Sequence, residues 1–472
     1  MEKASNLIKT ISVNNKENSA INGQARSVRD SVTGPKPALT LADALALIVG
    51  IVVGAGIFRT PSLVAANVNS EGMFLTAWVL GGIVSVVGAL CYAELTTAFP
   101  NTGGDYHFLG KAFGKRIAFL FAWARMSVIQ TGSIALLAFI FGDYASQIYS
   151  FGEYSSVIYA AMVVVLLTGI NIAGLILGTW TQKVLTIVEV LGILLIIIAG
   201  FFFVPDTAVG GGAPQITASG QTGSLGLAMV FVLLTFGGWN EAAYISAELR
   251  SGRKNMVKAL VLSILIITAL YLLINLAYLH SLGLNGMSTS DAVAGDVVRV
   301  AFGETGVFLI GVLVAVSALT SANATIFTGA RTNYALGRDF KAFTFIGKWN
   351  PRASAPVNAF IVQGLISLAL IGLGLITRNG FETIVEYTAP VFWFFFLMVG
   401  FSLFILRYKE PHAERPFRVP LYPVTPIVFC ITSAYLLYSS VVYTGLGALV
   451  GIGVLLAGVV VLVLFKIQKS AV

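Results

Sequence analysis

The chain is a succession of long apolar segments separated by short polar intervals. About twelve segments between residues 41 and 466 are mostly apolar over roughly 17 to 25 residues or more, the length that an α-helix needs to cross a bilayer. In lipid every backbone amide and carbonyl needs an internal partner, and a helix supplies these partners within one segment. We therefore predict an all-α polytopic membrane protein with about 12 transmembrane helices.

The composition supports this class of protein and excludes others. Apolar residues make up 57% of the chain and charged residues 11%, whereas a soluble domain has about 25% charged residues. The two cysteines, Cys91 and Cys430, and the three histidines show no metal or disulfide spacing, and the chain has no Walker or Gly-x-Ser-x-Gly motif. We expect no enzyme activity, no catalytic or metal site, and no cofactor.

Lysine and arginine indicate how the chain is oriented in the membrane. They gather in residues 1–40 and in alternate intervals, while the opposite side carries only Arg299 and Arg378. The positive-inside rule then places both termini in the cytoplasm, with residues 1–40 as a disordered tail and residues 467–472 as a short one. The formal net charge of +8 therefore reflects topology, and nucleic acid is not an expected partner. The short intervals favour a plasma membrane, specifically a bacterial inner membrane.

Two of the apolar segments are interrupted by glycine. The first contains Gly54-Ala55-Gly56 near its middle, and a later one contains Phe236-Gly237-Gly238-Trp239. Glycine costs about 1 kcal/mol relative to alanine inside a helix, so both runs predict a break in the helix. The alternative interpretation is that these glycines only allow helices to pack closely. A matched pair of broken spans instead indicates the substrate site of a secondary transporter.

The positions of the breaks also predict the domain organisation. Each interrupted span opens a set of five, which is the layout of two inverted repeats. We expect the first repeat at residues 41–204, the second at 224–408 and two extra helices at 423–466.

Three stretches resemble a known family. They are Val53-Gly54-Ala55-Gly56-Ile57-Phe58, then Cys91-Tyr92-Ala93-Glu94-Leu95 with Pro100-Asn101-Thr102-Gly103-Gly104-Asp105-Tyr106, and Phe236-Gly237-Gly238-Trp239-Asn240 with Glu248-Leu249-Arg250. In order and spacing they resemble the amino acid–polyamine–organocation (APC) superfamily, in particular its L-type amino acid transporter branch. The resemblance covers Leu39 to about Arg418. It implies the LeuT-type fold and secondary active transport of amino acids by alternating access.

The chemistry of a broken helix agrees with an amino acid substrate. A break leaves amide N–H groups that suit a carboxylate and carbonyl groups that suit an ammonium group. We predict that the backbone around Gly54 binds the substrate, with the amides of Ala55, Gly56 and Ile57 on its carboxylate. The ammonium group is expected at the carbonyls near Val52, Phe236 and Gly237. The family often has serine at the position of Ala55. The backbone donors remain, so carboxylate binding is still expected, but the resemblance does not extend to fine specificity.

The second break is expected to form the side-chain pocket and a gate. The resemblance aligns the family's gating aromatic residue with Leu234, and Phe236 is a possible substitute. Trp239 either lines the site or only packs, because buried aromatic residues mostly serve burial. Asn240 is expected to bond substrate or backbone. A carboxylate at Glu241 either favours a cationic substrate or lies against a helix end.

Charged residues inside the spans are further candidates, since inserting one costs about 2.5–3.5 kcal/mol or more. Glu94 is expected to be a structural partner for loop amides or for a basic residue. Glu189 and Arg125 either form a buried ion pair, or Glu189 binds a coupling proton. A third interpretation is a sodium ion beside Glu189, with oxygens from Ser317, Thr320 and Ser321. In the family's sodium-independent members, a lysine aligned with Glu189 resembles a built-in cation that replaces sodium. Glu189 has the opposite charge, so the resemblance gives no argument for sodium independence here.

The expected function is an amino acid exchanger or a proton-coupled symporter. The alternative is a non-transporting amino acid sensor or partner subunit built on a transporter scaffold, although such a protein would not need both breaks. The expected partners are the amino acid and the lipid bilayer. The short loop near Phe151 has no cysteine for a disulfide-linked partner, so no obligatory protein partner is expected.

Overall fold

The computed structural model describes residues 35–54, 56–203, 225–250, 252–290, 292–376 and 387–464. Within these ranges the chain is helical, and the only β-pairings are the isolated bridges Leu39–Leu249 and Asn350–Ala355. The helices follow one another as α2 (Leu41–Val52), α3 (Gly56–Ala65), α4 (Glu71–Ala98), α5 (Asp105–Phe113), α6 (Lys115–Ala124), the π-helical turn η1 (Arg125–Ile129), α7 (Gln130–Ile148), α8 (Ser155–Ala173), α9 (Leu175–Phe202), α10 (Leu225–Thr235), the 3₁₀ helix η3 (Trp239–Ile245), α11 (Gly252–Thr289), α12 (Val293–Phe302), α13 (Glu304–Asp339), η4 (Lys341–Phe343), α14 (Val357–Ile376), α16 (Ala389–Lys409), α17 (Val424–Thr444), η5 (Gly445–Gly447) and α18 (Ala448–Leu464).

Length and hydropathy identify the membrane spans in the described part of the chain. Ten helical units qualify, and the bent pair α2–α3 makes an eleventh. The last unit, Val424–Leu464, has 41 residues, about twice the length that a bilayer requires. Gly445 divides it into α17 and α18 with a φ of +53°. This division accounts for the expected number of about twelve spans.

The surface of the bundle suits a lipid environment. Large apolar side chains such as Ile176, Trp180, Leu446 and Val463 are more than half exposed. In water a continuous apolar surface of this kind would drive association, whereas in a bilayer it contacts acyl chains. The described residues therefore form a polytopic membrane protein, as the sequence predicts.

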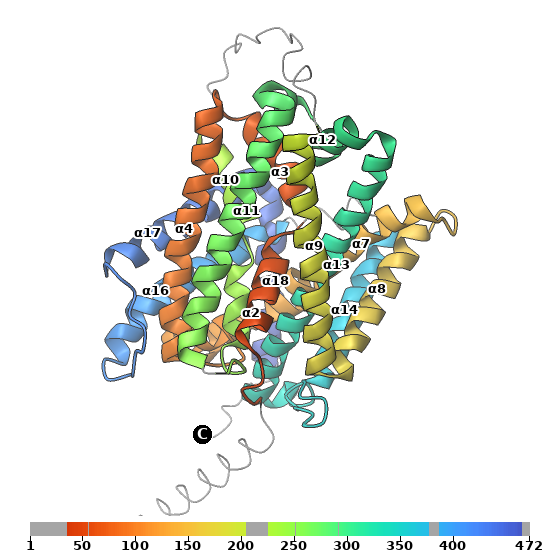
Figure 1. Ribbon diagram of the computed structural model, residues 1–472. Coiled ribbons are helices and arrows are strands. Elements are labelled where there is room, and N and C mark those ends of the chain that lie inside the picture. Colours follow the sequence, from red (N-terminus) through yellow and green to blue (C-terminus); the bar gives the residue numbers. More distant parts are fainter. Residues whose placement is uncertain are drawn as a thin grey trace, which may run out of the picture.

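The first predicted break is present. Helix α2 ends at Val52 and α3 begins at Gly56, and their axes differ by 47°. Figure 1 shows α2 and α3 one above the other in the middle of the bundle. Helix α2 packs against α9, α11 and α13, while α3 packs against α10, α11 and α12. The contact around Gly50 is so close that a Cβ atom there would lie 2.3 Å from the Thr186 hydroxyl.

The second predicted break is also present, and it has a different form. Helix α10 ends at Thr235, and Gly238 has a left-handed conformation with a φ of +108°. A Cβ atom is disfavoured in that conformation, which explains glycine at this position. The chain then continues as the 3₁₀ helix η3. Both glycine runs therefore interrupt their spans.

Candidate functional site

A cavity of about 420 Å³ lies beside the second break. Ile51 at the end of α2 lines one side of it, and Gln130 and Thr325 contribute polar groups from α7 and α13. Trp239, Phe396 and Phe429 contribute aromatic surface. Among the residues that the sequence predicts for the site, the lining contains Leu234, Gly237, Gly238, Trp239, Asn240 and Arg125.

The first break lies next to this cavity, and some of the backbone polar groups at the break already have hydrogen-bond partners. The Val52 carbonyl accepts a hydrogen bond from the Tyr271 hydroxyl at 2.9 Å. The Ile57 amide donates to the Gly54 carbonyl at 3.4 Å. Ala55, the centre of the predicted carboxylate site, lies outside the described residues.

Tyr271 connects the two breaks. Its hydroxyl lies 2.9 Å from the Val52 carbonyl and 3.1 Å from the Thr235 carbonyl, the ends of α2 and α10. The carbonyl ends of both broken helices therefore converge on one hydroxyl. Sequence reasoning missed this residue. The available signal was a tyrosine within an apolar span, because a buried hydroxyl usually finds a partner.

Phe236 does not act as a substitute gate at the cavity. Its side chain is buried and packs against Trp78 and Tyr271, with ring centroids 6.3 and 5.0 Å away. Trp239 is the aromatic residue of this segment that lines the cavity, where it also packs against Tyr92 at 5.2 Å. Phe236 faces α4 and α11, whereas its neighbours Leu234 and Gly237 face the cavity, so it does not take the place of the gating residue.

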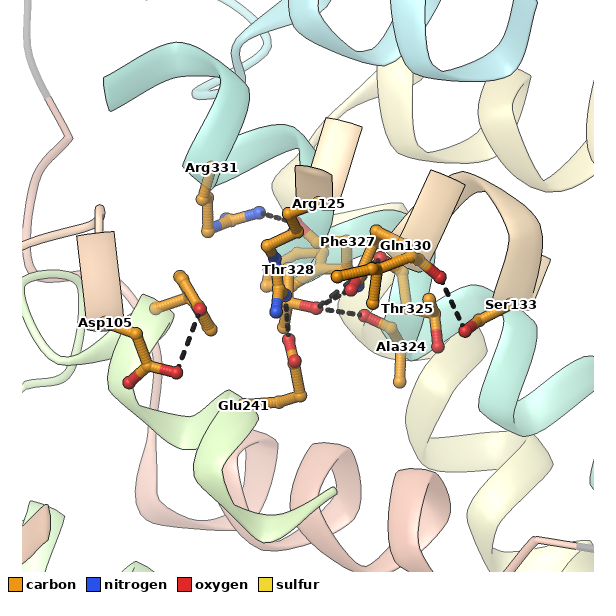
Figure 2. A network of polar contacts seen from close by, with 12 residues as sticks. Asp105, Arg125, Gln130, Ser133, Glu241, Ala324, Thr325, Phe327, Thr328 and Arg331 are labelled. Carbon is orange, nitrogen blue, oxygen red and sulfur yellow. Dashed lines mark hydrogen bonds and ion pairs between the residues drawn. The ribbon is translucent and has the colours of Figure 1, made fainter. Parts of the chain in front are cut away.

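Arg125 pairs with Glu241 rather than with Glu189. Its guanidinium Nη2 donates to Oε2 of Glu241 at 2.6 Å, and the two side chains are 3% and 8% exposed. The guanidinium also stacks over the Tyr244 ring at 4.2 Å. Figure 2 shows Arg125 reaching Glu241 beside the polar group of Gln130. The predicted pair Arg125–Glu189 is therefore wrong, and Glu241 is not an unpaired carboxylate awaiting a cationic substrate.

Glu189 is left without a counter-charge among the described residues. It is completely buried, and neither carboxylate oxygen has a hydrogen-bond partner of acceptable geometry. Ser317 lies beside it, but the Ser317 hydroxyl donates to the Val53 carbonyl at 3.1 Å. A serine hydroxyl has one hydrogen to donate, so Ser317 serves the first break and not the carboxylate.

The other hydroxyls proposed around Glu189 are also engaged. Ser321 donates to the Gly50 carbonyl at 3.2 Å, and Thr320 donates to the Val316 carbonyl of its own helix at 2.8 Å. Ser317 and Ser321 therefore fasten α13 to the end of α2. Their oxygens retain acceptor capacity, because each hydroxyl has two lone pairs.

Glu94 is a structural partner, as the sequence predicts. Its carboxylate accepts hydrogen bonds from the Arg407 guanidinium, at 2.8 Å for Nε, and from the Val419 amide at 2.7 Å. Arg415 lies 3.4 Å away. The residue thus joins α4 to both ends of the segment between α16 and α17.

The stretch Pro100–Tyr106 packs against η3 and forms hydrogen bonds at its C-terminal end. Gly104 has a φ of +49°, and a Cβ atom there would lie 2.6 Å from the Tyr244 ring. The Asn101 amide donates to the Ser246 hydroxyl, which itself lies 3.1 Å from the Asn101 carbonyl. Asp105 begins α5 and accepts a hydrogen bond from the Tyr244 hydroxyl at 3.2 Å. The glycines of this stretch therefore allow a loop to approach an aromatic ring closely.

Comparison with known proteins identifies relatives of the whole membrane region. The family model "Amino acid permease" matches residues 39–465. The b(0,+)-type amino acid transporter 1 of Mus musculus is 30% identical over 411 residues, covering 85% of this chain and 82% of the relative. The Large neutral amino acids transporter small subunit 2 of Homo sapiens is 30% identical over 444 residues, covering 90% of this chain and 79% of the relative.

These relatives correct one expectation and leave another without support. The word "subunit" in the second name means that this relative is one part of a larger transporter. The expectation of no obligatory protein partner is therefore wrong, because a missing loop cysteine excludes only one kind of covalent link. Both relatives are mammalian, so they give no support to a bacterial inner membrane.

Proposed function

The chain belongs to the amino acid permease family of the APC superfamily, with relatives in its L-type branch, and from this premise we propose that it binds an α-amino acid at both helix breaks and moves it by alternating access. It is an amino acid transporter and not an enzyme, since the family and its relatives are transporters. The family implies the LeuT-type arrangement. We propose that its two repeats are residues 41–204 and 224–408, with the helices of 423–466 added.

The convergence of both breaks on Tyr271 carries this proposal. One hydroxyl lies within 3.1 Å of the carbonyl ends of α2 and α10, so both ends are close enough to face one small ligand. We propose that the substrate ammonium group binds to carbonyls near Val52, Phe236 and Gly237. Its carboxylate is placed at the amides that begin α3, where the helix dipole favours an anion.

The cavity favours a neutral amino acid. Arg125 and Glu241 neutralise each other in its wall, so neither presents an unbalanced charge to the substrate. Trp239, Phe396 and Phe429 offer apolar surface for a side chain. A relative is named for large neutral amino acids, which agrees with this assignment.

Glu189 is the proposed coupling site, with a proton as the coupling ion. An ionised carboxylate that is fully buried and unpaired is strongly unfavourable, so this group is expected to bind a proton or a cation. A protonated Glu189 would donate to the Ser317 oxygen, whose own hydrogen is held by Val53. The presence of a proton on Glu189 would thereby affect the first break through the side chain of Ser317.

Assembly and orientation follow the relatives and the charge distribution. We expect a further subunit to accompany the chain, as the name of the small-subunit relative implies for that protein. We propose that both termini are cytoplasmic, because the positive-inside rule favours the side with the excess of lysine and arginine.

Uptake of labelled leucine and other neutral amino acids into proteoliposomes tests this function. Each amino acid is assayed with unlabelled amino acid inside, with an inward proton gradient and with an inward sodium gradient. Uptake driven by protons and abolished by Glu189→Gln supports coupling at Glu189, while Glu71→Gln, at an exposed carboxylate, should retain it.

Other outcomes redirect the proposal. Uptake that requires internal substrate and ignores both gradients makes the protein an exchanger and removes the coupling role of Glu189. A sodium-driven signal replaces the proton by a sodium ion. Binding of amino acids without any uptake would favour the sensor alternative.

A further inference from the structure

Asp105 is a buried carboxylate outside the membrane spans. It is the first residue of α5, and it is only 3% exposed. One of its oxygens accepts a hydrogen bond from the Tyr244 hydroxyl. The other makes no hydrogen bond within the described part of the chain, although the Tyr92 hydroxyl, which is also without a hydrogen bond, lies beside the carboxyl group. A buried carboxylate oxygen without a partner indicates a missing proton or donor.

Asp105 belongs to a cluster of three charged side chains whose charges do not balance. Arg125 and Glu241 form an ion pair at 2.6 Å, and Tyr244 stacks on that guanidinium while it bonds Asp105. Two carboxylates thus share one guanidinium, so the fully ionised cluster carries a net charge of −1. Excess charge in a buried site is costly, and one bound proton removes it.

The other charged groups around α5 that the structure describes already have partners. From α16, Arg407 is bound by Glu94 and Lys409 donates to the Ala112 carbonyl. From α13, Arg331 is bound by Glu248, and Asp339 accepts from Tyr106. From α4, Tyr92 faces Asp105 as a neutral hydroxyl. Thus Arg125 is the cation that faces Asp105, and Glu241 already binds it.

The cluster is mechanically connected to the substrate cavity. Glu241 and Tyr244 both lie on η3, which follows the second break, and Glu241 lines the cavity. The loop before Asp105 packs on the Tyr244 ring through Gly104. Figure 2 shows Asp105 approaching η3 from α5 on the side away from Gln130.

We propose that Asp105 is a proton-binding site separate from Glu189. The proton on Asp105 sets the net charge of the cluster with Arg125 and Glu241, and thereby how loop 101–105 packs on η3. Binding one proton converts the carboxylate to a carboxylic acid and makes the cluster neutral. Loss of the proton makes Asp105 compete with Glu241 for Arg125 and strengthens the hydrogen bond that Asp105 accepts from Tyr244, so the contacts that hold η3 change.

The titration range agrees with this role. Burial raises the pKa of Asp105 to about 7, although Arg125 opposes the shift and Glu241 adds to it. Between about pH 6 and about pH 8 the protonated fraction then falls from about nine tenths to about one tenth. The transport consequence rests on the proposed function, whereas the proton binding does not.

Infrared difference spectroscopy of the purified full chain tests proton binding directly. A protonated carboxyl band should titrate with a midpoint near 7 in the wild type and be absent in Asp105→Asn. Asp339→Asn is the matched control, because Asp339 also accepts from a tyrosine, at 2.7 Å, but is partly exposed. The band should persist in that variant and in Glu189→Gln. A band near pH 7 that survives Asp105→Asn, or no such band in the wild type, overturns the proposal.

A second variant guards against a folding defect in Asp105→Asn. Tyr244→Phe removes a donor that stabilises the ionised carboxylate, so the midpoint should move to higher pH. An unchanged or lowered midpoint in a folded Tyr244→Phe protein contradicts the assignment.

Transport provides an independent measurement. In proteoliposomes, amino acid exchange should change several-fold as the pH on both sides rises from about 6 to about 8, following the protonated fraction of Asp105. Asp105→Asn should flatten this profile, and Asp339→Asn should leave it unchanged. A pH profile that is identical in Asp105→Asn and the wild type refutes the link to η3. Absence of all transport would count against the proposed function and leave the infrared test of Asp105 valid.

Discussion

The buried ion pair between Glu248 and Arg331 allows a sharp test of how this bundle is held together. Nε and Nη2 of Arg331 donate to the two Glu248 oxygens at 2.6 and 2.8 Å, and the side chains are 1% and 0% exposed. The Glu248 carbonyl also accepts from the amides of Ala38 and Leu39. The pair therefore ties the turn after η3 and the segment before α2 to α13. Glu248→Gln keeps the shape of the side chain and removes its charge.

The expected loss can be worked from this geometry. Removing one partner of a buried pair leaves the other charge uncompensated, at a cost of about 3–5 kcal/mol in unfolding free energy. An unfolding entropy of about 2.1 cal/mol/K per residue gives about 1 kcal/mol/K for 472 residues. The melting temperature should therefore fall by about 3–5 °C. Glu304→Gln is the control, because Glu304 is 86% exposed and 3.4 Å from Arg299, and a surface pair contributes about 0–1 kcal/mol.

Thermal unfolding of the purified variants, followed by tryptophan fluorescence, measures these shifts. Arg331→Met and the double variant complete a double-mutant cycle. The double variant should be less destabilised than the sum of the single variants, because it buries no unpaired charge. A fall below about 1 °C for Glu248→Gln, or additive effects in the cycle, would refute the reasoning.

Three further predictions concern the breaks and Asp105. Gly238→Ala should lower the unfolding free energy by about 1–2 kcal/mol and reduce uptake in proteoliposomes, because residue 238 has a φ of +108°. Normal uptake by this variant would contradict the prediction. Tyr271→Phe removes the one hydroxyl that lies within hydrogen-bonding distance of two buried carbonyls, so unfolding free energy should fall by about 1–3 kcal/mol and substrate-induced thermal shifts should shrink; an unchanged shift argues against a role in binding. The folded state of Asp105 has a pKa of about 7 against 3.8 for the free group, so it binds the extra proton between these values. The melting temperature should therefore fall as pH rises from about 5 to about 7, and Asp105→Asn should remove this slope; a rising profile would refute the sign.

Local chemistry allowed much of this protein to be predicted from its sequence. Uninterrupted apolar segments must become helices in lipid, which predicts the number of spans. Glycine runs weaken a helix wherever they occur, so the interruptions at Gly54 and Gly238 follow from nearby residues alone. The need of a buried carboxylate for donors likewise predicted a structural partner for Glu94.

The partners of the buried charges depended on the tertiary structure. Arg125 lies 116 residues from Glu241, and nothing in the sequence favoured that carboxylate over Glu189. The direction of Phe236 depended on its packing against Trp78 and Tyr271, and Tyr271 reaches the Val52 carbonyl from 219 residues away. Secondary structure in a membrane follows from the demand of each segment for its own hydrogen bonds, so it is local. Charge pairing and cavity lining arise only when separate helices pack together, so the packed bundle decides them.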